Sequence, residues 1–289
     1  MTDLKEIKTQ PLALLKISIR LYLAHCLLPD IQSKTKAKEI NFTICKVILQ
    51  SIKYTSILLL FLFLESTIHA QNINDYLDSG NTKYNLGDYT GAISDYNNAI
   101  KFNPKNAKAF CSRGIAKGSL KDYTGAILDC NKSIDIDSSF TLAYLFRGNI
   151  KRGLGDYRGA ISDYNKVIEL NDSNYKADAY FGRGVAKENL GDHTGAILDY
   201  NKTLELDNKY VDAYVYRGAA KENLSDHTNA TLDENKAIKL DAKNSLAYFY
   251  RGFIKFNISD KEGACLDWSK AGELGYIDAY DYIKKYCSN

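Results

Sequence analysis

The chain has 289 residues, of which 45% are hydrophobic and 25% charged, and its formal net charge is +3. This composition is typical of a globular protein rather than a disordered one. The excess positive charge belongs to residues 1–72, which hold nine Lys and Arg against five Asp and Glu, leaving 29 against 30 in residues 73–289. A near-neutral body with both signs interspersed excludes nucleic acid as a partner.

Residues 1–52 have neither the repeat of the later chain nor a recognisable domain pattern. Met1 is the only methionine, so no later Met offers a start, and we place the true initiation at a codon near residues 48–51. We interpret this leader as a mis-assigned start, disordered in or absent from the mature protein. The Lys, Asn, Ile and Tyr content of the whole chain is typical of an AT-rich bacterial genome.

Residues 53–71 read KYTSILLLFLFLESTIHAQ, and their apolar run at 57–64 is eight residues long. A bilayer requires about 20 apolar residues, so the run is too short to span it. Lys53 before the run and Ala70 after it predict a signal peptide at residues 53–70, cleaved after Ala70. We therefore expect an exported protein, in the periplasm, in the envelope or secreted. The alternative is an uncleaved signal that anchors the protein in a membrane through residues 54–64.

From residue 73 the chain repeats itself with a period of 34 residues, apart from two extra residues near Tyr175. Arg-Gly recurs from residue 113 onward, and LGDYTGAISDYN at 86–97 recurs in similar form at 120–131, 154–165 and 190–201. Each unit holds two stretches whose apolar residues recur three and four apart, which predicts two amphipathic helices. An Asp between them is placed to cap the second helix, as Asp88, Asp122, Asp156, Asp192, Asp226 and Asp260.

This pattern resembles the tetratricopeptide repeat family. Six units carry the family's Gly in the first helix and its Ala in the second; the following aromatic is Tyr96, Tyr164, Tyr200 and Trp268, with Cys130 and Glu234 departing. The resemblance covers residues 73–278 and implies an all-α fold, a right-handed α-solenoid of six helix hairpins. We place the repeats at 73–106, 107–140, 141–174, 177–210, 211–244 and 245–278, followed by a cap helix at 279–289.

Each repeat also carries an Asp in its second helix, and five carry an Arg in the first, at equal distances from the turn. Pairing could therefore occur within a repeat or with the next one. Because the first repeat has Asp95 without an Arg and the cap supplies Lys285, pairing with the next repeat leaves no charge alone. We predict this structural ladder as Asp95–Arg113, Asp129–Arg147, Asp163–Arg183, Asp199–Arg217, Asp233–Arg251 and Asp267–Lys285.

In the family that the chain resembles, the first helices line a concave surface that binds peptides. Carried over to this sequence, the resemblance predicts a groove with apolar contacts and a row of amides able to hold a peptide backbone. The predicted groove residues are Leu145, Phe181, Val185, Val215, Phe249, Phe253, Asn189, Asn223 and Asn257. An alternative is that the groove holds another element of the same chain.

Four of the six cysteines fall in two pairs at matching heights on neighbouring predicted helices. Cys265 and Cys287 are each six residues from their turns, so a disulfide between them would fasten the cap to the last repeat. Cys111 and Cys130 are a second candidate pair. The other interpretation is four buried thiols, since disulfides need an oxidising compartment.

The sequence offers no set of residues for catalysis. It contains no phosphate-binding loop, nucleophile elbow or metal-ligand spacing, and His193 and His227 replace a tyrosine of earlier repeats. We therefore expect no enzyme, no cofactor and no metal. The expected function is that of a scaffold that binds an unidentified protein or peptide, with membrane contact only if the signal stays uncleaved. The alternative is a structural or assembly module of the cell envelope. The sequence leaves the oligomeric state open.

Overall fold

The computed structural model describes residues 46, 50–60 and 73–287, and the chain divides into two units, residues 1–67 and 68–289. In the first unit, residues 50–60 are helical, and Tyr54 and Ile57 expose more than half of their surface. No helix in the part of the chain that the structure describes is both long and apolar enough to cross a bilayer. The predicted cleavage site at Ala70 lies outside the described residues.

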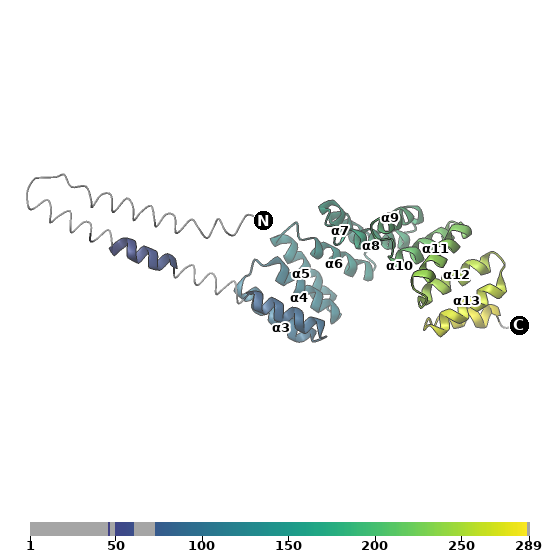
Figure 1. Cartoon of the computed structure of the whole chain (residues 1–289), viewed down its shortest axis with the longest axis horizontal. Coiled ribbons are helices and arrows are strands. Elements are labelled where there is room, and N and C mark those ends of the chain that lie inside the picture. The colour runs from purple at the N-terminus through teal and green to yellow at the C-terminus, as the bar shows by residue number, and fades with distance from the viewer. Residues whose placement is uncertain (1–45, 47–49, 61–72, 288–289) are drawn as a thin grey trace, which may run out of the picture. The chain divides into compact units, whose positions relative to one another are not determined.

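The second unit is a stack of helix hairpins, labelled in Figure 1. The first hairpin joins a helix over residues 73–85 to α3 (Tyr89–Phe102). The next hairpins are α4 (Ala107–Ser119) with α5 (Tyr123–Ile136), α6 (Thr141–Gly153) with α7 (Tyr157–Leu170), α8 (Lys176–Asn189) with α9 (His193–Leu206), α10 (Val211–Asn223) with α11 (His227–Leu240), and α12 (Ser245–Asn257) with α13 (Lys261–Glu273). The described residues contain no strand, and the predicted all-α solenoid is confirmed.

A short cap follows the last hairpin. It consists of α14 (Ala279–Tyr282) and one π-helical turn over Ile283–Cys287. Trp268 of α13 is fully buried beneath it, with its ring 5.3 Å from Tyr282 and 6.0 Å from Tyr286. The structure joins Cys265 of α13 to Cys287 in a disulfide, with Cα atoms 5.8 Å apart, as expected from their matching heights. The cap is thus held by aromatic packing and by a covalent bond.

The second helix of every hairpin begins at the predicted Asp. Each of these side chains accepts a hydrogen bond at 2.8–3.3 Å from the backbone N–H three residues later. The residue before the Asp adopts a left-handed backbone, which glycine tolerates at Gly87, Gly155 and Gly191. The same local sequence therefore ends one helix and caps the next in every repeat.

Small residues on the first helix let a large side chain of the second helix lie flat against it. A Cβ built on Gly184 would come 2.6 Å from Tyr200 Cε1, and one built on Gly252 would come 2.8 Å from Trp268. Ala92 and its five equivalents, at the same place of each repeat, are all fully buried. In four of the six repeats the core therefore places a small residue against an aromatic ring, and Cys130 and Glu234 take the place of the ring in the other two.

The predicted ladder between repeats is wrong, because each Arg pairs with the Asp of its own repeat. Arg113 Nε and Nη2 donate to both oxygens of Asp129, at 2.8 and 2.6 Å. The same pairs form as Arg147–Asp163, Arg183–Asp199, Arg217–Asp233 and Arg251–Asp267. A Lys one helical turn after the Arg joins each Asp, for example Lys117 at 2.8 Å.

The charge that seemed unmatched in the first repeat has local partners. Asp95 binds Lys83 at 2.7 Å and accepts a hydrogen bond from Ser79 at 2.6 Å. Burial opposes the ionised form, but these two bonds outweigh it and lower the pKa of Asp95. At the other end, Lys285 lies 4.9 Å from the ring centre of Tyr286, while Asp267 is paired with Arg251. Asp267 therefore does not require Lys285 of the cap as an ion-pair partner.

Each Arg nevertheless also links neighbouring repeats, through a different group. Its Nη1 donates to the side-chain oxygen of an Asn in the preceding repeat at 2.6–2.7 Å. The five junctions are Arg113–Asn97, Arg147–Asn131, Arg183–Asn165, Arg217–Asn201 and Arg251–Asn235. One guanidinium thus closes its own hairpin and fixes the hairpin before it, using the planar fork of donors that Lys lacks.

A candidate binding groove on the inner face

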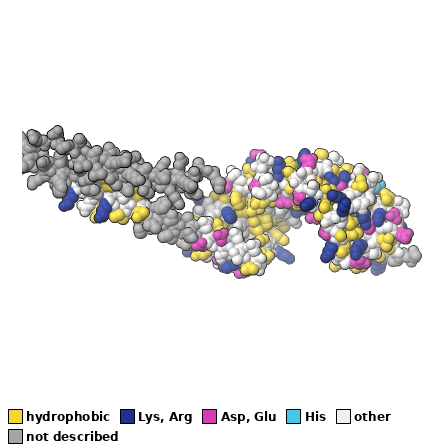
Figure 2. All heavy atoms as spheres, viewed as in Figure 1, with side chains coloured by type: hydrophobic (Ala, Val, Ile, Leu, Met, Phe, Trp, Pro, Cys, Tyr) yellow, Lys and Arg dark blue, Asp and Glu magenta, His cyan; other side chains and the backbone are white. Residues whose placement is uncertain are grey.

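The first helices of the hairpins form the inner side of the stack. Consecutive first helices contact one another directly along the series α4, α6, α8, α10 and α12, whereas no two second helices of the described repeats do so comparably. A stack whose first helices lie closer together curves towards them, so their outward-facing side chains line a concave groove. In Figure 2, hydrophobic side chains gather on the surface around α4, α5 and α6, and charges of both signs are interspersed elsewhere.

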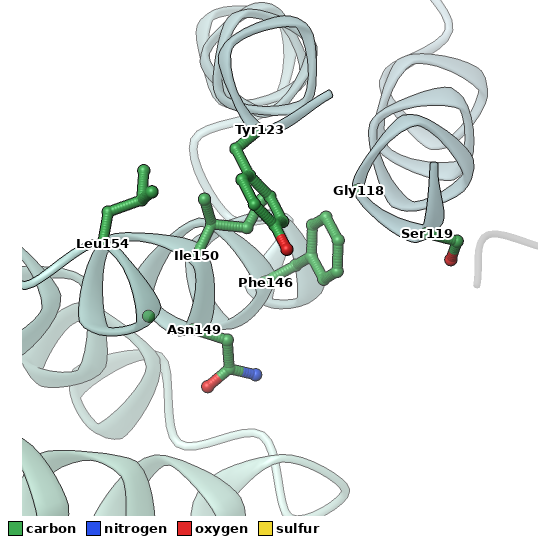
Figure 3. A pocket seen from close by; sticks show the side chains of 8 residues that line it. Gly118, Ser119, Tyr123, Phe146, Asn149, Ile150 and Leu154 are labelled. Carbon is green, nitrogen blue, oxygen red and sulfur yellow. The ribbon is translucent and has the colours of Figure 1, made fainter. Parts of the chain in front are cut away.

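The groove deepens into a pocket of about 360 Å³ between the second and third repeats. Its lining is mostly apolar and comes from α4, α5 and α6: Gly118, Ser119, Tyr123, Phe146, Asn149, Ile150, Gly153 and Leu154. Figure 3 shows the rings of Tyr123 and Phe146 side by side, with Asn149 directed away from them. The absence of a side chain at Gly118 makes room for Phe146, because a Cβ there would lie 2.8 Å from its ring.

The predicted apolar groove residues are less open than expected. Leu145, Val185, Val215 and Phe249 are buried in the repeat cores, at 0–8% exposure, and Phe181 and Phe253 are half-buried. Phe181 packs with Tyr210 and Tyr216, at ring-centre distances of 5.0 and 5.4 Å. The apolar contacts that a ligand would meet in the later repeats are therefore aromatic edges and not the aliphatic side chains.

The predicted row of amides is exposed but partly engaged. Asn223 Nδ2 donates to Glu188 Oε1 at 2.8 Å, and Asn257 Nδ2 donates to Glu222 Oε1 at 2.7 Å, in each case reaching the preceding repeat. Asn189 Nδ2 instead donates to the Val185 carbonyl of its own helix at 2.8 Å. These hydrogen bonds fix the positions of the amide side chains on the first helices that form the groove wall.

The two histidines complete the same contacts. His193 Nδ1 lies 2.7 Å from Glu188 Oε1, and His227 Nδ1 lies 2.8 Å from Glu222 Oε2. Each carboxylate therefore joins a His of its own repeat to an Asn of the next one. This explains the histidines structurally, and no group of three His, Cys, Asp or Glu in the described residues is arranged to hold a metal ion.

The two other cysteines among the described residues lie inside the repeats. Cys111 and Cys130 are buried and not bonded to each other. Burial raises the pKa of the Cys130 thiol to about 12, and burial likewise raises that of Cys111. Both thiols are thus protonated at neutral pH and occupy packing positions, which is the second of the two interpretations for this pair.

Sequence reasoning missed the charged residues Arg152, Glu188 and Glu222 on the inner helices. They occupy equivalent places in the third, fourth and fifth repeats, where the other repeats have Tyr84, Gly118 and Phe256. The sequence signal that could have identified these three residues is the change from uncharged to charged residues at one place of the repeat. The partners of Glu188 and Glu222 lie 35 residues ahead, so the periodic pattern alone did not reveal them.

Comparisons with known proteins agree with this architecture. A family model described as TPR repeat matches residues 80–121, and one described as tetratricopeptide repeat matches residues 147–211. No curated protein matches the sequence. Among solved structures, a crystal structure of MamA protein is 27% identical with a TM-score of 0.52, and the match covers 61% of this chain and 95% of that one.

Two further solved structures show the same fold at lower identity. YrrB, described as a TPR protein with an unusual peptide-binding site, is 19% identical with a TM-score of 0.54, and the match covers 65% of this chain and 97% of that one. PilF of Pseudomonas aeruginosa is 13% identical with a TM-score of 0.66, and the match covers 75% of this chain and 99% of that one.

Proposed function

Because the chain is a tetratricopeptide repeat protein, we propose that it is an exported, non-catalytic scaffold that binds a protein or peptide in its concave groove. The observation that carries the proposal is the open, mostly apolar pocket of about 360 Å³ between α4 and α6. A cavity of this size accepts one or two side chains of a partner. The peptide-binding site named for YrrB, a protein of the same fold, supports the same use of the groove.

The groove is also fixed in shape before a ligand arrives. Its walls are held by the Arg–Asn junctions and by the amide bonds from Asn223 and Asn257 to the preceding repeat. A preorganised groove loses little conformational entropy on binding, which favours affinity without a large buried area. Binding by mass action requires no catalytic group.

Export is supported by two features. The first is the signal-like stretch at residues 53–70, with Lys53 before its apolar run and the small residue Ala70 at the expected cleavage site. The second is the disulfide Cys265–Cys287, since structural disulfides persist in oxidising compartments. N-terminal sequencing of the native protein tests the proposal. A mature start at Gln71 is expected, and an intact segment 1–60 would contradict export by cleavage.

Groove binding is tested by panning a displayed random heptapeptide library against the immobilised full chain. Selected peptides should bind in solution, and Phe146→Asp, which places a charge in the pocket, should weaken that binding at least about tenfold. Leu266→Asp, on the outer face, serves as the matched control. Equal losses for the two variants, or no selected peptide, would contradict the proposal.

A structural or assembly module is a second candidate, favoured by an apolar row on the outer face. Leu128, Leu198, Leu232 and Leu266 stand at equivalent places on second helices, and each exposes 60–67% of its surface. In this second candidate function, the row serves as a self-association surface. Sedimentation of the wild-type protein and a Leu198→Ser, Leu232→Ser variant separates the candidates: a concentration-dependent oligomer that the variant loses supports assembly.

A further inference from the structure

Three buried polar atoms of the third and fourth repeats, beneath the inner helices, have no hydrogen-bond partner among the described residues. They are Arg152 Nε on α6, Glu188 Oε2 on α8 and the Tyr200 hydroxyl on α9. Buried polar groups in folded proteins are nearly always paired, so three such atoms in two adjacent repeats need an explanation. We call these three residues the polar subsite.

The unpaired hydroxyl has a clear origin in the sequence. In the first and third repeats the equivalent tyrosines donate to an Asn of the same hairpin, Tyr96 to Asn81 at 2.9 Å and Tyr164 to Asn149 at 2.7 Å. In the fourth repeat the place of that Asn is taken by Val185. The change removes the internal acceptor and leaves Tyr200 with its hydroxyl unused.

The three residues of the polar subsite act on one another. Burial raises the pKa of Tyr200, the Glu188 carboxylate raises it further, and the Arg152 guanidinium opposes the rise. Glu188 is oriented through its other oxygen, which binds His193 at 2.7 Å and Asn223 at 2.8 Å. Its Oε2 is therefore the acceptor that remains for a ligand.

Aromatic rings surround the polar subsite. The ring of Tyr200 lies 5.9 Å from that of Phe181 and 6.3 Å from that of Tyr216. The subsite is not sealed, because the Glu188 side chain is 16% exposed and Arg152 is half-buried on the inner helix α6. Binding there would require the long Arg152 side chain to rotate and admit a small planar group.

The chemistry of the three atoms defines that group. Arg152 Nε only donates, Glu188 Oε2 only accepts, and the Tyr200 hydroxyl does either. We propose that the polar subsite binds the side-chain carboxamide of a Gln or Asn in the partner peptide, an assignment that rests on the proposed function of the groove. The amide oxygen accepts from Arg152 and the amide nitrogen donates to Glu188, with Tyr200 completing either contact.

Other groups fit this arrangement less well. A carboxylate would be repelled by Glu188, an ammonium group would be repelled by Arg152, and an aliphatic side chain would leave all three atoms unpaired at a cost of about 1–3 kcal/mol for each. A main-chain amide does not reach the three atoms, because they lie below the surface of the groove and the side chains on both sides of that amide block its approach. A carboxamide at the end of a flexible stem reaches them.

The test compares selected heptapeptides with matched peptides in which the Gln or Asn is replaced. Peptides that bind the full chain should be enriched in Gln or Asn, and Gln→Glu in the best of them should weaken binding at least about tenfold, measured by fluorescence anisotropy. Tyr200→Phe should weaken binding of the Gln peptide about three- to tenfold. Its melting temperature should not fall, since it removes a hydroxyl that has no internal partner.

Glu188→Gln gives the sharpest result, because it exchanges an acceptor for a donor at Oε2. This variant should prefer the Glu peptide to the Gln peptide, reversing the wild-type order. Tyr96→Phe is the control: it strands Asn81, so it should lower the melting temperature without changing either affinity. If the wild-type protein binds no peptide, the proposed function fails. If it binds peptides without a preference for Gln or Asn, or if Glu188→Gln keeps the wild-type preference, only the polar subsite is overturned. The three atoms then bind water and not a ligand.

Discussion

Glu234 is the residue whose replacement should change stability in the most informative way. It occupies the place that an aromatic ring fills in four of the six repeats. The residue is 0% exposed, and neither carboxyl oxygen has a partner among the described residues. Burial raises its pKa well above the usual 4.5, with Asp233 adding to the rise and Arg251 opposing it.

The sign of the effect follows from proton binding. Below pH 4.5 both the folded and the unfolded chains hold the proton on Glu234. The contribution of this group to the free energy of unfolding is then fully present. Above pH 4.5 the unfolded chain releases the proton and the folded chain keeps it, so the free energy of unfolding falls with pH. The loss is about 1.4 kcal/mol for each pH unit until the pH passes the folded pKa.

Urea unfolding at pH 5, 6, 7 and 8 measures this loss, with the fluorescence of Trp268, the only Trp, as a reporter in the neighbouring repeat. Glu234→Gln keeps the shape and cannot titrate, so its stability should decline less with pH than that of the wild type. Glu234→Tyr should be more stable still at pH 7, since Gly218 faces this place as Gly184 faces Tyr200. Parallel pH profiles of wild type and Glu234→Gln would refute the reasoning.

Three further changes test the fold. Cys265→Ser removes the disulfide and should lower the free energy of unfolding by about 3 kcal/mol, and wild-type protein in reductant should match it in a thermal melt. Asp163→Ala strands the partly buried Arg147 cation and should cost about 3 kcal/mol in urea unfolding; a loss below 1 kcal/mol would mean that the pair is dispensable. Gly184→Ala forces a Cβ into an aromatic ring and should cost about 1–3 kcal/mol, whereas Gly153→Ala, with open space around it, should add up to about 1 kcal/mol; calorimetry giving both the same sign would contradict the packing.

The helices and their order were predictable because the signals for them are local. A capping Asp, an apolar stripe and a glycine turn recur together, and each acts on residues within a few positions of itself. Only α8 begins outside its predicted repeat, at Lys176, one residue early and beside the two extra residues of the fourth unit. Solenoids suit this kind of reasoning because each unit contacts only its neighbours.

The partners of the arginines were not predictable from spacing. An Arg and an Asp at equal heights can meet within one hairpin or across two, and the sequence pattern is the same in both cases. The argument from unmatched charges failed because Ser79 and Lys83 satisfy Asp95 locally. The contact to the preceding repeat is made instead by asparagines, whose oxygens accept from the Nη1 of the guanidinium, and the charge pattern does not predict it.

The groove was only partly predictable for a related reason. The resemblance identified the helices that line it, but not which of their side chains remain open once the repeats stack. Leu145 and Val215 turn into the core, while Arg152 and Glu188 of the inner helices each keep one buried polar atom without a partner among the described residues. The unused hydroxyl of Tyr200 depends on a Val at residue 185 and becomes visible only when the repeats are compared contact by contact.

The pairing of each Arg with its own Asp has a consequence for how such a chain can grow. Every ion pair closes inside one unit of the sequence, and every junction uses the same Arg and Asn contact with the unit before it. Duplication or deletion of one unit that carries the Arg would therefore create no stranded charge at these pairs and would keep the Arg and Asn contact at the new junction. The length of the groove can vary in steps of one repeat, and with it the length of the partner in the proposed function.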